Sequence, residues 1–594
     1  MNPHLQYPLK PDEIMRKKKR IRRELLAENG ERTPCRIAIL GGSTTAPIRE
    51  IVELFLLDKG IAPIFYESEY NKWYEDACFG NPELDAFHPQ IVYIHTSCVN
   101  LPLAQIPAGA DEATVETLAK AEFTRYQQAW NQLREKFGSA IIQNNFELPA
   151  NRVLGNLSAV IPSGRIHFVQ LMNQWFAKAA DSSLILQDLE FLAADLGLSH
   201  WYDPDGYALY KLALSSESIP GLARNLASII GAILGKSKKC LVLDLDDTIW
   251  GGVVSEDGVE GLELGHETPL GESYLAWQRY ILDLRDRGVI LAVCSKNDED
   301  IAKSGFTHPD CLLKPDDFIS FQANWEPKPE NIRQIATEIN IGLDSLVFLD
   351  DNPAERAIVR SQLPMVAVPE VNEREPFSYI RAIEEGRYFE VVTLSQDDLQ
   401  RNASYAQNKQ RKELETASGS YEDFLRSLAM EAEIAPFCET YLSRIAQLTN
   451  KSNQFNLTTH RYTETELWSI MQSNRYITLY GRLKDCFGDN GVVSVIIGEL
   501  KDAAVHIRLW LMSCRVLKRN MEQAMLDALV KASQAAGASQ LIGYYYPTKK
   551  NHMVSHLYES FGFTCVQDNS AGGIWKLPLT DYKNQNQFIR IQEH

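Results

Sequence analysis

The chain has 594 residues, of which 45% are hydrophobic and 23% are charged, and its formal net charge is −18. At about 150 residues per domain, this length predicts about four domains rather than one core. No apolar run approaches the ~20 residues of a membrane-spanning helix, and the charged N-terminal stretch does not resemble a signal peptide. The acidic balance argues against nucleic-acid binding, which depends on basic surfaces.

The ten cysteines are scattered along the chain, with no CxxC pair and no spacing typical of a metal site. This pattern favours free thiols in a reducing cytoplasm. One basic run, residues 17–23, departs from the acidic balance. We expect it to form the solvated face of an N-terminal helix, with a docking patch for an acidic partner as the alternative.

Residues 1–235 predict a doubly wound α/β domain. A short apolar strand at 36–40 is followed by a helix at 47–57 and by strands near 91–94 and 140–143. Strands that alternate with helices form a parallel sheet with helices on its faces.

A Gly41-Gly42-Ser43 turn directly follows the first of these strands. The pattern vaguely resembles the first block of the flavodoxin-like SGNH hydrolases, which would make Ser43 a nucleophile and Asn144 an oxyanion donor. The Asp-x-x-His that would activate the serine is missing, since the nearest stretch, residues 202–207, contains no histidine. We therefore expect a degenerate or docking domain rather than an active esterase.

Residues 236–370 predict a second doubly wound sheet, with apolar strands at 239–243, 289–294 and 345–349 and helices between them. Polar motifs stand where three strands end and where a helix starts, namely Asp244-Leu245-Asp246-Asp247-Thr248, Ser295, Lys328 and Asp350-Asp351. Ligands of such sheets bind at the carboxyl ends of the strands, so we expect the four motifs to meet there.

These residue types suit phosphoryl transfer, which depends on positioning and on charge neutralisation. Asp244 can act as the nucleophile that forms an aspartyl-phosphate, and Asp246 can protonate the leaving oxygen and later activate water. Magnesium prefers hard oxygen ligands, which the side chains of Asp244, Asp246, Asp350 and Asp351 can supply. The predicted phosphate-binding residues are Thr248, Ser295, Lys296, Asn297 and Lys328.

In their order and placement, the four motifs resemble those of the haloacid-dehalogenase (HAD) superfamily of phosphotransferases. Fifty residues separate Asp244 from Ser295, and 32 separate Ser295 from Lys328. Each interval must also hold a helix, so neither has room for a large cap domain. We expect an open site that admits a large or tethered substrate, with residues 251–258 forming a flap hairpin beside the nucleophile.

Longer strings resemble the FkbH-like family, subfamily IIIC of the same superfamily. They are DLDDTIWGGVVSEDG (244–258), CSKND (294–298), NWEPKPENI (324–332), FLDDNPAER (348–356), NQFNLTT (453–459), WLMSCRVL (510–517) and YYPTKKNHMV (545–554). The resemblance covers about residues 236–570. It implies a glyceryl transferase that dephosphorylates a three-carbon unit from 1,3-bisphosphoglycerate and loads it as a thioester on an acyl carrier protein for polyketide-type biosynthesis.

Two other functions fit the same motifs. One is a magnesium-dependent phosphohydrolase that acts on a small phosphoester without acyl transfer. The other is a scaffold that has kept its motifs without turnover, against which the intact DLDDT and DD motifs argue.

The remaining residues predict a helical connector at 371–420 and an α+β domain with an antiparallel sheet at 421–594. The last domain resembles the acetyltransferase (GNAT) fold, in which the strand before the long helix lies against a pantetheine arm. The loop at 515–520 lacks the glycines of the usual pyrophosphate loop. This loss suits a carrier-protein arm, which has no pyrophosphate.

Glyceryl transfer through an enzyme thiol needs an accessible cysteine, for which Cys294 and Cys514 are the candidates. Either could instead be a small buried hydrophobic residue. Residues predicted to face the carrier protein or its arm are Arg515, Lys518, Arg519, Lys549, Lys550 and Asn453. Ordinary solvated surface, or a structural turn for Asn453, is the alternative for these residues.

Overall fold

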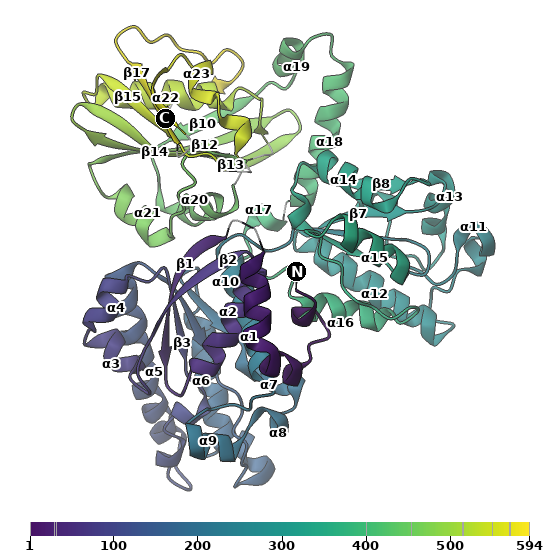
Figure 1. Cartoon of the computed structure of the whole chain (residues 1–594), viewed down its shortest axis with the longest axis vertical. Helices are drawn as coiled ribbons and strands as arrows, with labels where there is room; N and C mark the ends of the chain where they lie inside the picture. Colours follow the sequence, from purple (N-terminus) through teal and green to yellow (C-terminus); the bar gives the residue numbers. More distant parts are fainter. Residues whose placement is uncertain are drawn as a thin grey trace. The chain divides into compact units, whose positions relative to one another are not determined.

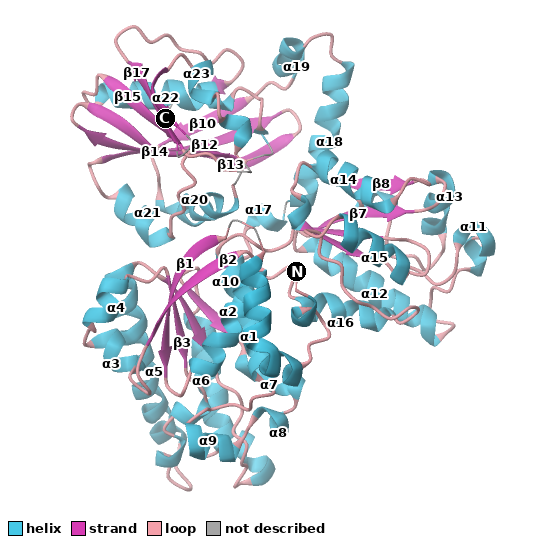
Figure 2. Ribbon diagram, in the orientation of Figure 1, coloured by secondary structure: helices cyan, strands magenta, loops and turns pink. Residues whose placement is uncertain are grey.

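The computed structural model describes residues 2–28, 30, 32–399, 401–452, 454–513, 516–548, 551–569 and 572–592. The chain divides into two compact units: Met1–Asp283 with Leu291–Ala336 and Ile341–Thr393, and Leu284–Ile290 with Thr337–Asn340 and Leu394–His594. The first unit contains two parallel sheets and the second a mixed sheet (Figures 1 and 2). The predicted α/β multidomain fold class is therefore confirmed. No helix among the described residues is both long and apolar enough to cross a membrane.

The N-terminal sheet has the strand order β2-β1-β3-β4-β5, and every neighbouring pair is parallel. Alternate residues of β1 point to opposite faces, so Ile37 and Ile39 enter one core while Ala38 and Leu40 enter the other. The first strand lies between β2 and β3, which makes β1/β3 the point where the strand order reverses. The strands are β1 (Thr33–Gly41), β2 (Ile61–Glu67), β3 (Ile91–His95), β4 (Ala140–Asn144) and β5 (Leu184–Gln187).

Helices cover both faces of this sheet. The core on one face includes residues of α1 (Pro11–Ala27), α2 (Ala46–Asp58) and α10 (Ile219–Ile233), and that on the other includes residues of α5 (Glu112–Phe137) and α6 (Arg165–Ala179). The shorter helices are α3 (Trp73–Cys78), α4 (Pro82–Phe87), α7 (Leu189–Leu196), α8 (Leu198–Trp201) and α9 (Pro204–Tyr210).

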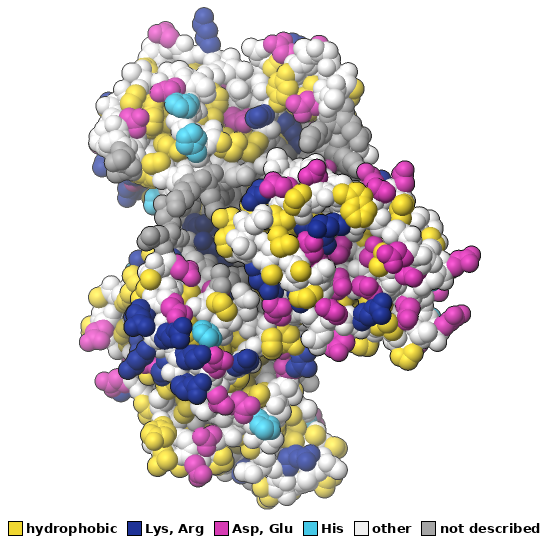
Figure 3. Space-filling model, turned by 45° about the vertical axis from the view of Figure 1, so that its right-hand side comes forward, with side chains coloured by type: hydrophobic (Ala, Val, Ile, Leu, Met, Phe, Trp, Pro, Cys, Tyr) yellow, Lys and Arg dark blue, Asp and Glu magenta, His cyan; other side chains and the backbone are white. Residues whose placement is uncertain are grey.

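The basic run lies on α1, whose opposite face buries Ile14, Ile21 and Leu25. Some of its cations pair with α2: Lys18 with Glu50 at 2.6 Å and Arg22 with Glu53 at 2.9 Å. Figure 3 shows lysine and arginine side chains gathered on the N-terminal domain. The run is therefore partly solvated and partly used to hold two helices together.

The second sheet has the order β8-β7-β6-β9, with β6 parallel to β9 and β7 parallel to β8. Its strands are β6 (Cys240–Leu243), β7 (Ile290–Ser295), β8 (Ser320–Ala323) and β9 (Leu346–Leu349). Its helices are α11 (Val254–Asp257), α12 (Pro269–Asp286), α13 (Glu299–Ser304), α14 (Lys328–Ile339), α15 (Pro353–Gln362) and α16 (Pro376–Gly386). Residues 236–393 are all described, and neither interval between the motifs contains a cap domain.

The flap differs from the predicted hairpin. Within residues 251–258 the chain forms the short helix α11 (Val254–Asp257), and one antiparallel bridge between Gly251 and Glu263 closes the loop around it. The Asp257 carboxylate accepts a hydrogen bond from the Val253 N–H at 2.8 Å, and the N–H of Val254 bonds to Asp246 at 3.1 Å. These side-chain acceptors satisfy donors that a hairpin would have paired across strands.

The C-terminal sheet has the order β16-β17-β15-β14-β13-β12-β10-β18, with β11 paired to β14. It is mixed, whereas an antiparallel sheet was predicted, because β14–β15 and β10–β18 are parallel pairs. The helix α22 (Met521–Ala535) connects β14 to β15, and such a crossover returns the chain in the same direction. The strands are β10 (Glu431–Ala435), β11 (Phe455–Asn456), β12 (Tyr476–Asp485), β13 (Gly488–Lys501), β14 (Ala504–Met512), β15 (Gln540–Tyr545), β16 (Thr564–Asn569), β17 (Gly572–Pro578) and β18 (Arg590–Ile591).

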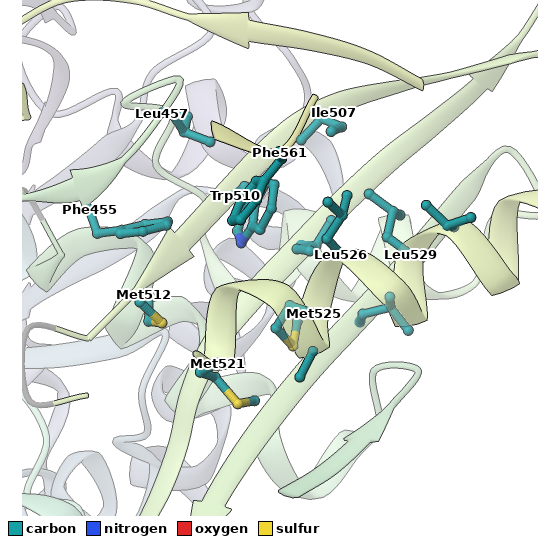
Figure 4. Packing of buried hydrophobic residues seen from close by; sticks show 14 of the residues in the cluster. Phe455, Leu457, Ile507, Trp510, Met512, Met521, Met525, Leu526, Leu529 and Phe561 are labelled. Atoms are coloured by element: carbon teal, nitrogen blue, oxygen red, sulfur yellow. The ribbon is translucent and has the colours of Figure 1, made fainter. Parts of the chain in front are cut away.

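One hydrophobic core of this domain lies between the sheet and α22, and a second includes Leu442, Ile445 and Leu467. Figure 4 shows Trp510 of β14 stacked near Phe561, with ring centroids 5.7 Å apart, beside Met525 and Leu529 of the helix. The other helices of the second unit are α17 (Gln396–Leu399), α18 (Arg401–Ala417), α19 (Tyr421–Ser427), α20 (Glu439–Lys451), α21 (Glu464–Met471) and α23 (Leu557–Ser560).

Candidate active site

Two neighbouring strands of the second sheet bring three carboxylates together. Leu243 pairs with Leu349 at the carboxyl ends of β6 and β9, so the residues that follow, Asp244 and Asp350, lie side by side. Carboxylate oxygens of Asp244, Asp350 and Asp351 all lie within 4.8 Å of one another. This edge is where the strand order reverses, which is the usual position of a ligand site in such sheets.

Lys328 joins two of these carboxylates from the first turn of α14. Its Nζ lies 2.8 Å from Oδ2 of Asp244 and 2.5 Å from Oδ2 of Asp350, and only 2% of the residue is exposed. Burial alone would lower the pKa of Lys328, but the charges of Asp244 and Asp350 outweigh burial and raise that pKa. Lys328 therefore stays positively charged inside the site.

Thr248 fixes the third carboxylate. Its hydroxyl donates to Oδ1 of Asp351 at 3.3 Å and accepts from the Asp351 N–H at 3.2 Å. Burial, then the charge of Asp244, raises the pKa of both Asp350 and Asp351. The raised values indicate that one lysine does not neutralise this much negative charge.

A divalent cation would supply the missing positive charge. Oδ1 of Asp244 is buried and has no hydrogen-bond partner among the described residues. Carboxylate oxygens are the hard ligands that magnesium prefers, and an uncompensated buried carboxylate oxygen is costly. The donor set of Asp244, Asp350 and Asp351 thus fits Mg²⁺.

The Asp246 carboxylate is not among the three that come together, although it was predicted to be a metal ligand too. Its Oδ1 accepts hydrogen bonds from Trp250 Nε1 at 3.0 Å and Val254 N at 3.1 Å, and its Oδ2 accepts one from Asn297 Nδ2 at 3.1 Å. Burial raises the pKa of Asp246, which these bonds partly oppose. A carboxyl with a raised pKa and a fixed orientation suits proton transfer better than metal binding.

The five predicted phosphate-binding residues do not all meet. Lys328 and Thr248 contact the carboxylates, and Ser295 is buried at the end of β7. Asn297 instead orients Asp246. Lys296 pairs with Glu355 of α15 at 2.6 Å and is partly exposed, so its ammonium group is engaged outside the cluster.

The structure adds Asp247 to the site, which the sequence interpretation left without a role. Its φ of 51° is in the left-handed region, which costs a residue with a side chain about 1 kcal/mol or more. The hydroxyls of Tyr274 and Tyr379 donate to its carbonyl oxygen at 3.0 and 3.1 Å, and its carboxylate accepts from the N–H of Gly252 at 2.9 Å. Asp247 is the third aspartate of the DLDDT string, and its position in that string was the sequence signal that could have identified it.

Cys294 is a poor candidate for the acyl-carrying thiol. Its side chain is fully buried, and its Sγ lies 3.8 Å from the backbone oxygen of Lys328. Burial raises the pKa of the Cys294 thiol far above its usual value. A pantetheine arm has no access to a thiol in that position, so this prediction is wrong.

The residues predicted to face a carrier protein fall into three groups. Cys514 lies outside the described residues, as do Arg515, Lys549, Lys550 and Asn453. Lys518 is exposed. Arg519 is 7% exposed and binds Asp485 at 3.1 Å, so it cannot belong to a basic rim. The ion pair between Arg519 and Asp485 was not predicted, because a buried acidic partner 34 residues away leaves no signal in the local sequence.

Comparisons with known proteins connect this geometry to characterised folds. A family model described as the N-terminal domain of FkbH matches residues 36–231. The solved N-terminal part of protein BF1531 from Bacteroides fragilis, which contains a phosphatase domain complexed with Mg, is 30% identical. That alignment covers 63% of this chain and 99% of the other, with a TM-score of 0.58. No curated protein matches the chain.

Two acetyltransferase structures match shorter parts of the chain. The ribosomal-protein-S18-alanine N-acetyltransferase of Escherichia coli is 16% identical over 26% of this chain and 99% of the other, with a TM-score of 0.21. The PaiA N-acetyltransferase of Thermoplasma acidophilum, solved with coenzyme A, is 15% identical over 25% and 99%, also with a TM-score of 0.21.

Proposed function

Because the chain belongs to the FkbH family and has a HAD-like phosphatase domain, we propose that this enzyme is a glyceryl transferase. It would take a three-carbon unit from 1,3-bisphosphoglycerate, remove the phosphate ester and load the glyceryl group as a thioester on an acyl carrier protein. The observation that supports the phosphoryl step is the convergence of Asp244, Asp350 and Asp351 around Lys328 at one sheet edge.

The chain's own groups can perform the phosphoryl step in two stages. Asp244 attacks the phosphorus through a carboxylate oxygen, the P–O ester bond breaks, and the carboxyl of Asp246 protonates the leaving oxygen. Water then attacks the aspartyl-phosphate and gives a proton back to Asp246, which releases phosphate and frees Asp244. Lys328 holds Oδ2 of Asp244 in place and balances the charge of the phosphoryl oxygens.

Mg²⁺, held by Asp244, Asp350 and Asp351, would neutralise charge on the transferring phosphoryl group. Thr248 would keep Asp351 oriented for this role, and the Asp247 turn would hold the nucleophile loop. The absence of a cap domain from residues 236–393 suits a donor presented to a large partner.

The acyl step needs a thiol outside the buried phosphoryl site. An acyl phosphate is already activated, so a thiolate attacks its carbonyl carbon, the C–O bond breaks and phosphate leaves. Cys514 stays the predicted thiol of the C-terminal domain, and the mixed sheet there supplies the surface for the carrier's arm. Exposed Lys518 is a candidate contact for the acidic carrier protein.

Intact-mass spectrometry of the carrier protein tests this function. With 1,3-bisphosphoglycerate, Mg²⁺ and holo carrier protein, the carrier should gain about 88 Da, one thioester-linked glyceryl group. Asp244→Asn should leave a phosphorylated adduct or none, and Cys514→Ala should abolish loading while phosphate release continues. Free phosphate without any mass gain on carrier or enzyme would contradict glyceryl transfer and support a phosphohydrolase of a small phosphoester.

A further inference from the structure

A buried hydrogen-bonded chain in the N-terminal domain links a thiol to a carboxylate. Sγ of Cys98 lies 2.7 Å from the hydroxyl of Tyr202, whose acceptors are Oε1 of Glu147 at 3.1 Å and the Leu148 carbonyl oxygen at 3.0 Å. The other oxygen of Glu147 accepts the backbone N–H of Cys98 at 3.4 Å. The three side chains come from segments as much as 104 residues apart, and the phosphoryl site uses none of them.

This chain lies where a parallel sheet presents its ligands. Cys98 and Glu147 follow the carboxyl ends of β3 and β4, and the strand order reverses between β1 and β3. The Asn100 side chain connects the loop after β1 to the loop after β3. It donates to the Gly42 carbonyl at 2.7 Å and accepts the Ser97 N–H at 3.0 Å.

The loop after β1 approaches the same edge closely and carries an unused hydroxyl. A Cβ added at Gly42 would lie 2.6 Å from the Asn100 side chain, so a larger residue there would displace Asn100. The next residue, Ser43, is 3% exposed, and its Oγ has no hydrogen-bond partner among the described residues. A buried hydroxyl without a partner is costly, and a bound polar group would satisfy it.

Burying the ionised carboxylate of Glu147 at this position costs free energy. Glu147 is fully buried, and burial raises its pKa to about 6 although several hydrogen bonds oppose the shift. Burial and the charge of Glu147 also raise the pKa of the Cys98 thiol. The resting thiol is therefore protonated, and it becomes a nucleophile only if a base removes its proton. Glu147 can act as that base, because it accepts the Tyr202 hydroxyl beside the thiol and also interacts with the thiol itself.

We propose that Cys98, of which 4% is exposed, is a nucleophilic thiol that accepts an acyl group from a small, activated, uncharged acyl compound, with Tyr202 and Glu147 receiving its proton. Sulfur attacks the carbonyl carbon, the bond from that carbon to its leaving group breaks, and a Cys98 thioester forms. The S–H proton passes to the Tyr202 oxygen while the Tyr202 proton passes to Glu147. Protonated Glu147 then returns a proton to the leaving group or to solvent.

The surroundings of the thiol select an uncharged acyl group. Glu147 and Tyr202 are the ionisable groups that act on the pKa of Cys98, and no lysine or arginine is among them. An anionic acyl compound would be repelled by Glu147, in contrast to the phosphoryl site, where Lys328 lies among the carboxylates. This second site goes beyond the proposed function, and it can be tested without 1,3-bisphosphoglycerate or a carrier protein.

Acetylation of the full-length enzyme by p-nitrophenyl acetate is the test. We expect a burst of one equivalent of p-nitrophenolate and a mass gain of about 42 Da on the Cys98 peptide, which neutral hydroxylamine removes as it does a thioester. Cys98→Ser and Cys98→Ala should both abolish the burst. Cys78→Ser is the matched control, because Cys78 is a partly exposed thiol of the same domain, and it should keep the burst.

The relay is tested by two further variants. Glu147→Gln and Tyr202→Phe should each slow acetylation of Cys98 by about 100-fold, the usual size of general-base catalysis. The double variant should be no slower than either single variant, because the two groups act as one unit. A merely structural role would give additive losses that follow the melting temperature, and such losses would overturn the relay.

Three results would overturn the proposal: an adduct on another residue, a hydroxylamine-stable ester on Ser43, or an unchanged acetylation rate in Glu147→Gln. If Glu147→Gln fails to fold, Tyr202→Phe alone decides, since its ring and packing are retained. Hydrolysis of p-nitrophenyl phosphate should be unchanged in all these variants, which separates failure of this site from failure of the phosphoryl site.

Discussion

The N-terminal and phosphatase domains are built alike but place different chemistry at the same edge of their sheets. Both have a parallel sheet whose order reverses beside the first strand, and both carry polar loops at the carboxyl ends. The phosphatase edge has three carboxylates around one lysine, whereas the N-terminal edge has one carboxylate that reaches a thiol through a tyrosine. In both domains the strand order fixes where a ligand binds, while the local charge decides which ligand binds there.

Because of this difference in charge, we expect the phosphatase edge to bind a metal ion and the N-terminal edge not to need one. At the phosphatase edge, burial and the neighbouring carboxylates raise the pKa values of Asp350 and Asp351. A bound cation would lower the free energy of these charges. At the N-terminal edge, the single raised pKa of Glu147 arises mainly from burial, so protonation removes the cost without any ion.

Removing the nucleophile should have the largest effect. Asp244→Asn should lower Mg²⁺-dependent hydrolysis of p-nitrophenyl phosphate by about 10⁴-fold or more, because the attacking oxygen and a cation ligand are lost together. Asp316→Asn, which changes an exposed carboxylate in the same domain, should retain full activity. Residual hydrolysis within 10-fold of wild type would show that Asp244 is not the nucleophile.

Removing one of the other carboxylates should weaken the cation site. We expect Asp350→Asn to lower Mg²⁺ affinity by about 100-fold, measured by isothermal titration calorimetry, with Asp316→Asn again as the control. Chelation of divalent cations should stop phosphate release and leave acetylation of Cys98 unchanged. Loss of both activities on chelation would break the contrast between the two edges.

Replacing the buried glutamate should stabilise the N-terminal domain near neutral pH. A carboxyl whose pKa is higher in the folded state, here about 6 against an ordinary value of 4.5, destabilises the fold as pH rises through that window. Glu147→Gln should therefore gain up to about 2 kcal/mol at pH 7 and nothing at pH 4. Hydrogen exchange of the β3 and β4 amides measures this difference. A variant that is less stable than wild type at pH 7 would contradict the assigned cost of the carboxylate.

The smallest effect is expected at Lys296. Its partly exposed ion pair with Glu355 is worth at most about 1 kcal/mol, and its ammonium group lies outside the carboxylate cluster. Lys296→Ala should change hydrolysis of p-nitrophenyl phosphate by less than about 3-fold, whereas Lys328→Ala should nearly abolish it. A large loss in Lys296→Ala would mean that this side chain turns to the phosphate during the reaction.

The sequence predicted the phosphatase domain well because its signals are local. A buried strand followed at once by a polar motif gives both the strand and the end that carries the ligand, as for Asp244 after β6 and Asp350 after β9. The FkbH-like resemblance is also confirmed, and the match to residues 36–231 extends it to the first domain.

The rest depended on contacts between distant residues. Tyr202 and Cys98 are 104 residues apart, and nothing in either segment indicates the other. The parallel pairing of β14 with β15 was missed because a strand pattern does not give its direction. The helix α22 was predicted between these two strands, but the parallel pairing that such a crossover produces was not. Cys294 was misjudged because a strand residue beside a motif can point into the core instead of the site.

The carboxylate of Asp485 has a consequence for how this protein can be cut into fragments. Arg411 of α18 binds both of its oxygens, at 2.7 and 2.9 Å, and both residues are almost fully buried. A recombinant C-terminal fragment that starts at residue 421 would lose this arginine and keep Arg519 as the cation bound to Asp485. A fragment that starts at residue 394 retains the whole cluster, and is the better choice for expression and crystallisation.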